Sequence, residues 1–317
     1  MRETVAAGSS VGSAGKPETK LAHICVCVCT YKRPVLLQRL LREIAQQQTG
    51  GLFTLSVAIA DNDESRSAES VVVAAREELG LEIKYCIEPR QNIALARNMV
   101  VENALGDYLA FIDDDEFPGP DWLLTLFNAC IEYKVDGVLG PVKPHFEDNA
   151  PKWVVDGRFY DRPSYPTGYV IDGSKGRTGN VLLRRSIFAG GEPPFRPEFR
   201  TGEDQDFFRR MIEKGHVFIW CHEAMAWEVV PPSRWSRKFI IKRALLRGAV
   251  SLRHPTCGAV CIFKSFVALP CYALILPLQL LRGQGRFMKD TDRFFHHLGR
   301  ILALFHIDCV SEAYVTQ

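Results

Sequence analysis

The chain has 317 residues, of which 47% are hydrophobic and 24% are charged. This composition is that of an ordered globular protein, and the length suffices for one large α/β domain with an additional segment. A formal net charge of +2 argues against wholesale binding to nucleic acid, so any basic surface has to be local.

The ten cysteines form no CxxC pair, and no signal peptide is recognisable, which favours reduced thiols in the cytosol. Cys25, Cys27 and Cys29 alternate along one apolar run and therefore share one face of a strand. Because free cysteine packs as a small hydrophobic residue, we expect core positions here and no metal site.

Residues 1–20 are small, polar and rich in glycine and serine, and they predict a disordered leader. From residue 23 onward, apolar runs of strand type alternate with helical stretches. Strands are expected at 23–29, 52–60, 81–87 and 107–113, and helices at 34–48, 67–80 and 92–106. This alternation indicates βαβ units in an α/β fold with a doubly wound, mostly parallel sheet.

Ligands of such sheets bind beyond the carboxyl ends of the strands, and the residues at these positions are polar. Thr30-Tyr31-Lys32-Arg33-Pro34 follows the first run, Asp61-Asn62-Asp63 the second, and Asp113-Asp114-Asp115-Glu116 the fourth. We therefore expect these side chains to gather at one edge of the sheet.

A second section, from about 136 to 230, completes the same domain. It contains strand-like runs at 136–142, 178–185 and 217–221, and a loop, 201–206, that opens a helix. The expected domain therefore covers residues 21–230, and residues 231–317 form a separate C-terminal region.

The C-terminal region is basic and apolar. Residues 233–254 predict a basic amphipathic helix at a membrane surface or, alternatively, a core helix with a solvated basic face. Residues 265–281 carry no charge but contain Pro270 and Pro277, which favours a re-entrant or interfacial segment over a buried helix. The basic residues around this segment suit anionic lipid headgroups on the cytoplasmic side: Arg282, Arg286, Lys289, Arg293 and Arg300.

The run of four carboxylates at 113–116 is the most specific chemical signal. Like charges at this spacing repel and raise one another's pKa, so a cation is expected to neutralise them. Mg²⁺ or Mn²⁺ takes oxygen ligands, usually one or two carboxylates with phosphates and waters, which Asp113 and Asp115 can provide. The alternative is a solvated acidic turn.

Two further groups suit the same site. Glu203 and Asp204 open a helix, whose N-terminus stabilises carboxylate, so Asp204 can serve as a general base; a simple helix cap is the alternative. Arg90 and Arg97 follow the third strand, and Arg97, on the first turns of a helix, can reach a diphosphate unless it is only an exposed helical arginine.

These motifs together resemble a known family. TYKRP, ADND, NIALARN, FIDDDE followed by PGPDWL, GNVLLRR and GEDQDFF occur in the order found in inverting family 2 glycosyltransferases, which have the GT-A fold. The resemblance covers roughly residues 23–250. Within the family, VCTYKRP, VLGPVKPHF and VPPSRWSRKFIIKRALLRG resemble the bacterial exopolysaccharide glucosyltransferases of the succinoglycan type.

The resemblance implies a role for each matched position. Thr30, Tyr31 and Arg33 would line the nucleotide pocket, Asp61 would bind the base, and Arg97 would lie near the diphosphate. Asp113 and Asp114 would hold ribose and phosphate groups, Asp115 would ligate the Mg²⁺ or Mn²⁺ with Asp113 beside it, and Asp204 would be the catalytic base next to Glu203. Trp122 and Trp153 would be structural or would face the acceptor.

One position departs from the family pattern. Many members carry a histidine near the end of the strand after the catalytic loop, where it is a further metal ligand. This chain has Trp227 at about that position, and His222 is a candidate substitute.

The implied reaction is a single displacement with inversion, from UDP-glucose to an oligosaccharide on a polyprenyl diphosphate carrier, at the cytoplasmic face of the inner membrane. One alternative is a metal-dependent sugar nucleotidyltransferase, but its glycine-rich phosphate loop is missing from TYKRP. The other is a membrane-peripheral scaffold without catalysis, which the intact Asp115 and Asp204 disfavour.

Overall fold

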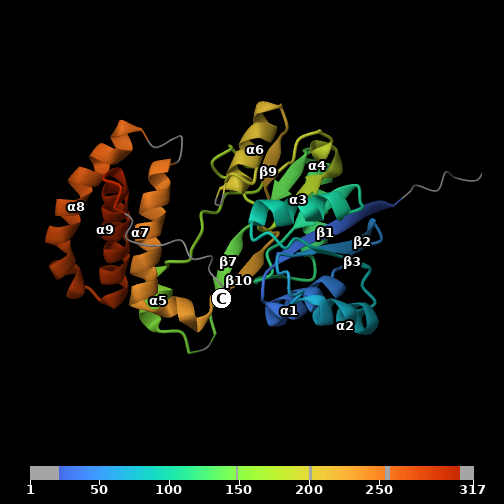
Figure 1. Ribbon diagram of the computed structural model, residues 1–317, viewed down its shortest axis with the longest axis horizontal. Coiled ribbons are helices and arrows are strands. Elements are labelled where there is room, and N and C mark those ends of the chain that lie inside the picture. Colours follow the sequence, from blue (N-terminus) through green and yellow to red (C-terminus); the bar gives the residue numbers. More distant parts are fainter. Residues whose placement is uncertain (1–20, 148, 200–201, 254–257, 308–317) are drawn as a thin grey trace, which may run out of the picture.

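The computed structural model describes residues 21–147, 149–199, 202–253 and 258–307 (Figure 1). The expected leader at 1–20 lies outside the described residues. The predicted fold class is confirmed: a mixed, mostly parallel sheet carries helices on both faces, and a helical section follows it.

The first half of the chain alternates strands and helices as predicted. Its elements are β1 (Ala22–Thr30), α1 (Pro34–Ala45), β2 (Phe53–Asp61), α2 (Glu69–Leu79), β3 (Ile83–Ile87), α3 (Ile93–Asn103), β4 (Tyr108–Phe111), β5 (Glu116–Pro118) and α4 (Trp122–Glu132). Local signals fix several ends. Pro34 is the first residue of α1, Gly80 ends α2 at a φ of 65°, and the Asn92 side chain caps α3 by accepting from the Ala94 amide at 2.9 Å.

The second half contributes shorter strands. Its elements are β6 (Gly137–Leu139), β7 (Val142–His145), α5 (Lys152–Gly157), β8 (Val181–Arg184), α6 (Glu203–Glu213), β9 (Phe218–Trp220) and β10 (Ala226–Val229), with short 3₁₀ turns at Arg185–Phe188 and Pro232–Trp235. The C-terminal helices are α7 (Arg237–Arg253), α8 (Ala259–Leu280) and α9 (Gln284–Leu304).

The main sheet has the order β3-β2-β1-β4-β8-β6-β9. β1 is parallel to β2 and β4, whereas β8 is antiparallel to both of its neighbours. The register pairs Thr30 with Asp61 and Cys27 with Phe111, so the carboxyl ends of β1, β2 and β4 reach the same edge. This is the edge at which the sequence places its polar residues.

A second sheet, β5-β10-β7, lies beside that edge. β10 runs antiparallel to β5 and parallel to β7, and Glu228 of β10 is in register with Glu116 of β5. The sequence analysis does not predict this sheet. It adds carboxylates to the edge that already carries the acidic run.

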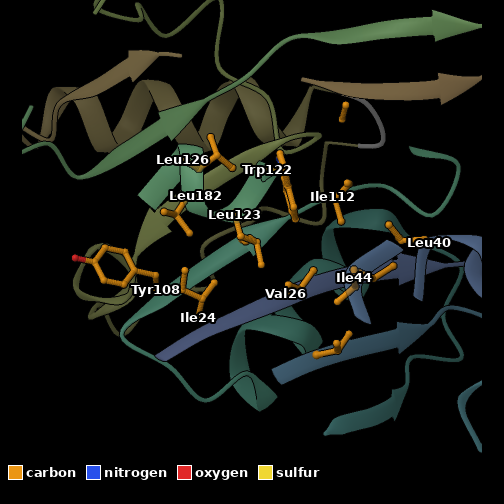
Figure 2. Packing of buried hydrophobic residues seen from close by; sticks show 14 of the residues in the cluster. Ile24, Val26, Leu40, Ile44, Tyr108, Ile112, Trp122, Leu123, Leu126 and Leu182 are labelled. Atoms are coloured by element: carbon orange, nitrogen blue, oxygen red, sulfur yellow. The ribbon is translucent and has the colours of Figure 1, made fainter. Parts of the chain in front are cut away.

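The two faces of the main sheet hold two separate cores. Figure 2 shows part of the first, in which β1, β4 and β8 contact α1 and α4 through residues such as Ile24, Leu40 and Leu123. The second core contains Cys25 and Cys27, with Cys29 packed against it, alongside residues of α3 and α6. The prediction that these cysteines are core residues is confirmed.

The C-terminal helices stand beside the sheet domain, with α9 packed against α7, α8 and α5 (Figure 1). α8 is a continuous helix through Pro270 and Pro277, which argues against a re-entrant segment, whereas the interfacial segment stays a prediction. Only 6% of its most apolar window is buried in the protein, so the buried-helix alternative is wrong. Among the described residues, α8 is the one helix whose length and composition would suffice to cross a membrane.

The predicted amphipathic helix at 233–254 also needs correction. α7 begins at Arg237, and several of its basic side chains contact the protein: Arg243 lies over the Tyr160 ring at 4.8 Å and Arg247 pairs with Asp292 at 2.5 Å. One side of α7 therefore packs on the protein, and its contact with a membrane surface stays a prediction. Arg300 is likewise internal, since it donates to Ser251 at 2.9 Å.

Candidate active site

The ends of β1 and β4 meet through side chains. The Thr30 hydroxyl donates to Asp114 at 2.8 Å, and the Arg33 guanidinium donates to Asp114 at 2.9 Å and to Asp115 at 3.1 Å. The TYKRP loop and the acidic run thus form one structure, as the sequence predicts. Thr30 and Asp114 are buried, so this contact lies below the more exposed carboxylates at the same edge of the sheet.

Asp115 lies where charges crowd most. Burial, together with the neighbouring carboxylates of Asp114 and Asp113, raises the pKa of Asp115 to about 7. Two guanidinium groups oppose it, from Arg33 and from Arg234, whose nitrogen is 3.8 Å from Asp115. The carboxylate is therefore strongly disposed to take a cation.

Residues of the second sheet surround the same group. Arg162 pairs with Glu228 and lies 3.7 Å from Glu116, and Arg234 pairs with Glu228 at 3.1 Å. Glu116 is buried, which raises its pKa well above the ordinary value, and its Oε1 has no hydrogen-bond partner in the described part of the chain. Charge is thus compensated across three separate segments.

Sequence reasoning missed three of these residues. Arg162 lies in a loop without a recognisable motif, and Glu228 lies on a strand with only four residues. Arg234 is a charged residue that the sequence analysis could have placed at the site. Because the residues around it are basic and apolar, they instead predict that it belongs to a membrane-surface helix. In the structure it contacts the acidic edge instead.

Arg97 joins the acidic run to α6. Its side chain is 9% exposed, pairs with Glu203, and lies 3.7 Å from Asp113. Burial raises the pKa of Glu203, and the Arg97 charge opposes that rise. The alternative of an exposed helical arginine is wrong, and Glu203 serves as the partner of a buried guanidinium.

Asp204 is the second residue of α6, at the N-terminus where the sequence places it. It is half-buried, and its Oδ1 accepts from the Gln205 amide at 2.8 Å. Its negative charge favours the protonated forms of Arg97 and Arg177. Asp204 is therefore close enough to interact electrostatically with Arg97, which pairs with the neighbouring Glu203 and lies beside the acidic run.

Asp61 is fully buried at the end of β2. Its carboxylate accepts from the Tyr85 hydroxyl at 2.7 Å and from the amides of Ala68 and Asp63 at 2.9 and 3.1 Å. An ionised carboxylate has about four acceptor positions, so one remains for a donor such as a base N–H. The base-binding role of Asp61 stays a prediction. So does the place of Tyr31 in the nucleotide pocket; its ring centre is 5.2 Å from the Lys32 ammonium.

Other candidate residues are placed outside the centre of the site. Arg90 is exposed and pairs with Glu88 at 2.8 Å, and Trp122 is buried and donates to Asn180 at 2.7 Å. Trp153 packs in a small cluster beside α5. Trp122 is thus structural, and Arg90 does not join the acidic edge.

The position expected to hold a histidine carries an aromatic pair instead. Trp227 stacks on Phe117 with ring centres 5.8 Å apart. His222 is exposed and interacts with Ser164 at 3.0 Å. No contact between His222 and the acidic run is present among the described residues, and its role as a substitute ligand stays a prediction.

The acidic edge suits a divalent cation bound in part by substrate. Within the described ranges, no three His, Cys, Asp or Glu side chains form a complete metal site. Mg²⁺ commonly uses only one or two carboxylates and completes its shell with phosphates and waters. A Cβ on Gly179 would lie 2.8 Å from Glu116 Oε1 and 3.2 Å from Asp113 Oδ2, so only glycine at this position leaves room for the two carboxylates. The donor set fits such an ion.

Comparison with known proteins decides the family. Residues 25–189 match the family model described as "Glycosyl transferase family 2". The chain belongs to this family. Membership speaks against the nucleotidyltransferase alternative, and it agrees with the resemblance drawn from the motifs.

The chain is similar in sequence to proteins of exopolysaccharide synthesis and of glycosyl transfer. It is 37% identical over 229 residues to succinoglycan biosynthesis protein ExoM of Rhizobium meliloti (strain 1021), covering 71% of this chain and 73% of that protein. It is 24% identical over 190 residues to the putative glycosyltransferase EpsH of Bacillus subtilis (strain 168), covering 58% and 54%.

Two solved structures share the GT-A fold with this family member. The mannosyltransferase PcManGT from Pyrobaculum calidifontis, in complex with GDP-Man and Mn²⁺, superposes with a TM-score of 0.59 at 18% identity, covering 92% of this chain and 89% of that one. S. aureus TarS 1–349 in complex with UDP gives 0.52 at 14% identity, covering 90% and 92%. At these identities the likeness establishes the fold alone.

Proposed function

We propose that this protein is a metal-dependent, inverting glycosyltransferase that moves glucose from UDP-glucose to a lipid-linked oligosaccharide during exopolysaccharide synthesis. The observation that carries the proposal is the pairing of Arg97 with both the acidic run and α6. Through it, a cluster able to hold a nucleotide diphosphate and a candidate base become parts of one site. The similarity to ExoM supports the pathway, and the UDP and GDP-Man complexes of fold relatives support a nucleotide-sugar donor.

Asp204 is the proposed base. It would accept the proton of the acceptor hydroxyl as that oxygen attacks the anomeric carbon, and a single displacement inverts this carbon. Glu203 would position α6 through Arg97 and take no proton, because its carboxylate is already engaged. Arg97 would hold Asp113 in place. Its effect on the diphosphate would then be indirect, because Asp113 would hold the ion that contacts the diphosphate.

Asp113 and Asp115 would hold the Mg²⁺ or Mn²⁺. When bound, the ion would neutralise charge that develops on the departing nucleoside diphosphate. Arg33 and Arg234 now share Asp115, and a diphosphate would give both guanidinium groups a second anionic partner. Thr30 would keep Asp114 oriented beneath the ribose.

The acceptor would be an oligosaccharide on a polyprenyl diphosphate, met at the cytoplasmic face of the inner membrane. The support for this placement is α8, whose 18-residue window of mean hydropathy 2.1 is almost entirely uncovered by the protein. Such a surface is costly in water and stable in a bilayer. Deletion of residues 256–317 is one way to test this placement, but it would also remove α9 and expose the side of α7 that packs against it. Substitution within α8 is therefore the better test of membrane association.

The first experiment is calorimetric titration of the full chain with UDP, GDP and dTDP, in Mg²⁺, in Mn²⁺ and in EDTA. The proposal predicts metal-dependent binding with preference for UDP. A transfer assay with UDP-glucose and a lipid-linked acceptor should follow. Nucleotide binding without transfer from any donor would favour the inactive scaffold, and no nucleotide binding at all would refute the proposal.

A further inference from the structure

A cavity of about 340 Å³ lies where α8 turns into α9. It is lined by Gln279, Arg282, Arg286, Lys289, Asp290 and Arg293. The volume falls within the roughly 300–1,000 Å³ of small-molecule sites and exceeds the space that a single ion needs. Four basic side chains against one carboxylate make the lining strongly positive.

The positive charge of the cavity is mostly uncompensated. Asp290 pairs with Arg293 at 3.1 Å. Arg282, Arg286 and Lys289 are exposed, and none of them has an ion-pair partner within the ranges that the structure describes. Gathered cations without counter-charges repel one another, so an anion that bridges them would relieve a cost already present in the fold.

A second polar group in the wall points to the kind of ligand. The Gln279 Oε1 atom is buried and has no hydrogen-bond partner among the described residues. A buried unsatisfied acceptor costs free energy that a hydroxyl donor would recover. A ligand carrying both a phosphate and a hydroxyl would therefore satisfy both features of the lining.

The position of the cavity indicates where that ligand is met. α8 spans 22 residues, which at about 1.5 Å per residue matches the roughly 30 Å hydrocarbon core of a bilayer. At the end of α8 beside the cavity, Leu274, Leu278 and Leu281 are 77%, 62% and 86% exposed. If α8 lies in lipid, the cavity at the turn between α8 and α9 opens at the depth of the headgroups.

We propose that this cavity binds the phosphate of an anionic phospholipid, with Arg282 and Arg286 on the phosphate and Gln279 accepting from a headgroup hydroxyl. Guanidinium groups suit phosphate because they donate two parallel hydrogen bonds. The inference rests on the proposed placement of α8 in the membrane. It does not depend on the donor sugar or on the active site.

The test is flotation of the full chain with vesicles of phosphatidylcholine alone or of phosphatidylcholine mixed with phosphatidylglycerol. The double variant Arg282→Gln/Arg286→Gln removes two cavity charges, and Lys238→Gln/Lys242→Gln removes two exposed charges from α7 of the same bundle. We expect the wild type and the α7 variant to prefer the anionic vesicles. The cavity variant should lose on the order of 30-fold in partitioning to them, since each basic residue at such a surface contributes about 1 kcal/mol.

Each other outcome overturns the inference. Equal losses in both variants mean diffuse attraction and no site. Equal wild-type partitioning to both vesicles removes the phosphatidylglycerol preference while leaving α8 in the membrane. Displacement by inorganic phosphate at constant ionic strength would assign the cavity to a soluble anion. UDP titration of the same proteins tests the proposed function separately. Absence of UDP binding in the wild type would refute the proposed function and would leave the lipid-binding result unaffected.

Discussion

The acidic edge of the sheet and the C-terminal bundle both concentrate charge, and they treat it in opposite ways. At the edge, carboxylates of β5, β10 and the loop after β4 are buried or half-buried and paired with arginines from distant segments. At the α8–α9 turn, Arg282, Arg286 and Lys289 are exposed and lack ion-pair partners in the described part of the chain. Buried charge requires compensation within the fold, whereas exposed charge is free to meet a partner outside it.

The comparison separates what each region contributes. Charges at the edge bind one another and therefore hold the sheet, the second sheet and α6 in one arrangement. Charges at the bundle stabilise little, because exposed groups gain only modest energy in water. Substitutions at the edge should therefore affect both stability and chemistry, and those in the bundle should affect one property at a time.

The largest effect is expected from Asp204→Asn. The amide keeps the shape of the carboxylate but cannot take the acceptor proton, so transfer should fall by roughly 10²–10⁴-fold. Affinity for UDP with metal should change little, because the proposed base contacts the acceptor side. Single-turnover transfer and UDP calorimetry on the same preparation measure both. A parallel loss of UDP affinity would place Asp204 in the nucleotide site instead.

Breaking the buried pair at the edge should mainly reduce stability. Arg97→Met removes the partner of Glu203 and leaves a buried carboxylate uncompensated, which costs about 3–5 kcal/mol. Chemical denaturation measures the loss. The double variant Arg97→Met/Glu203→Met should recover much of it, since no charge is then left alone. If the single variant is as stable as the wild type, the edge does not depend on this pair.

Residue patterns in the sequence predict the edge better than the bundle. Between residues 23 and 113, apolar strand-like runs alternate with helical stretches. The runs are apolar throughout because a parallel sheet is buried on both faces, and this pattern can be recognised within each short segment. The polar residues after β1, β2 and β4 then meet because parallel strands end together. These steps need no knowledge of distant contacts, and they are confirmed.

Contacts between distant short segments could not be predicted in this way. β5 and β10 have three and four residues, too few for a period, and they bring Glu116 beside Glu228. Arg162 and Arg234 reach the same carboxylates from loops. In α8, proline predicts an interruption, but a long apolar helix continues through both prolines. The roles assigned to Tyr31, Asp61 and Asp204 remain predictions.

A smaller effect is expected where α7 crosses α9. A Cβ on Gly248 would lie 2.0 Å from the His296 carbonyl oxygen, which is backbone and cannot move aside. Gly248→Ala should therefore separate the helices and cost about 1–3 kcal/mol, more than alanine returns as a helix former. Gly258→Ala is the matched control, because no atom of the described residues lies within 4 Å of its Cβ position. In thermal unfolding, the midpoint temperature of Gly248→Ala should be lower than that of the wild type, and that of Gly258→Ala should be unchanged. Both variants should keep their affinity for UDP.

The smallest effect concerns pH and is confined to the bundle. Burial and, to a smaller extent, the nearby Arg300 charge lower the pKa of His296 from 6.5 to about 4. Its neutral ring can accept from Arg300 at 3.0 Å. As pH falls from about 6.5 towards 4, the unfolded chain takes a proton that the folded chain refuses, so the folded bundle loses stability across this window.

The variant His296→Gln isolates this contribution, because glutamine offers Arg300 an acceptor that does not titrate. Its free energy of unfolding should fall less steeply than that of the wild type between pH 6.5 and 5, by about 1 kcal/mol once solvent screening is allowed for. Urea unfolding at a series of pH values measures the slope, and the window lies above the ordinary range for exposed carboxylates. Parallel slopes for the two proteins would mean that protonation of His296 is not what weakens the bundle in acid.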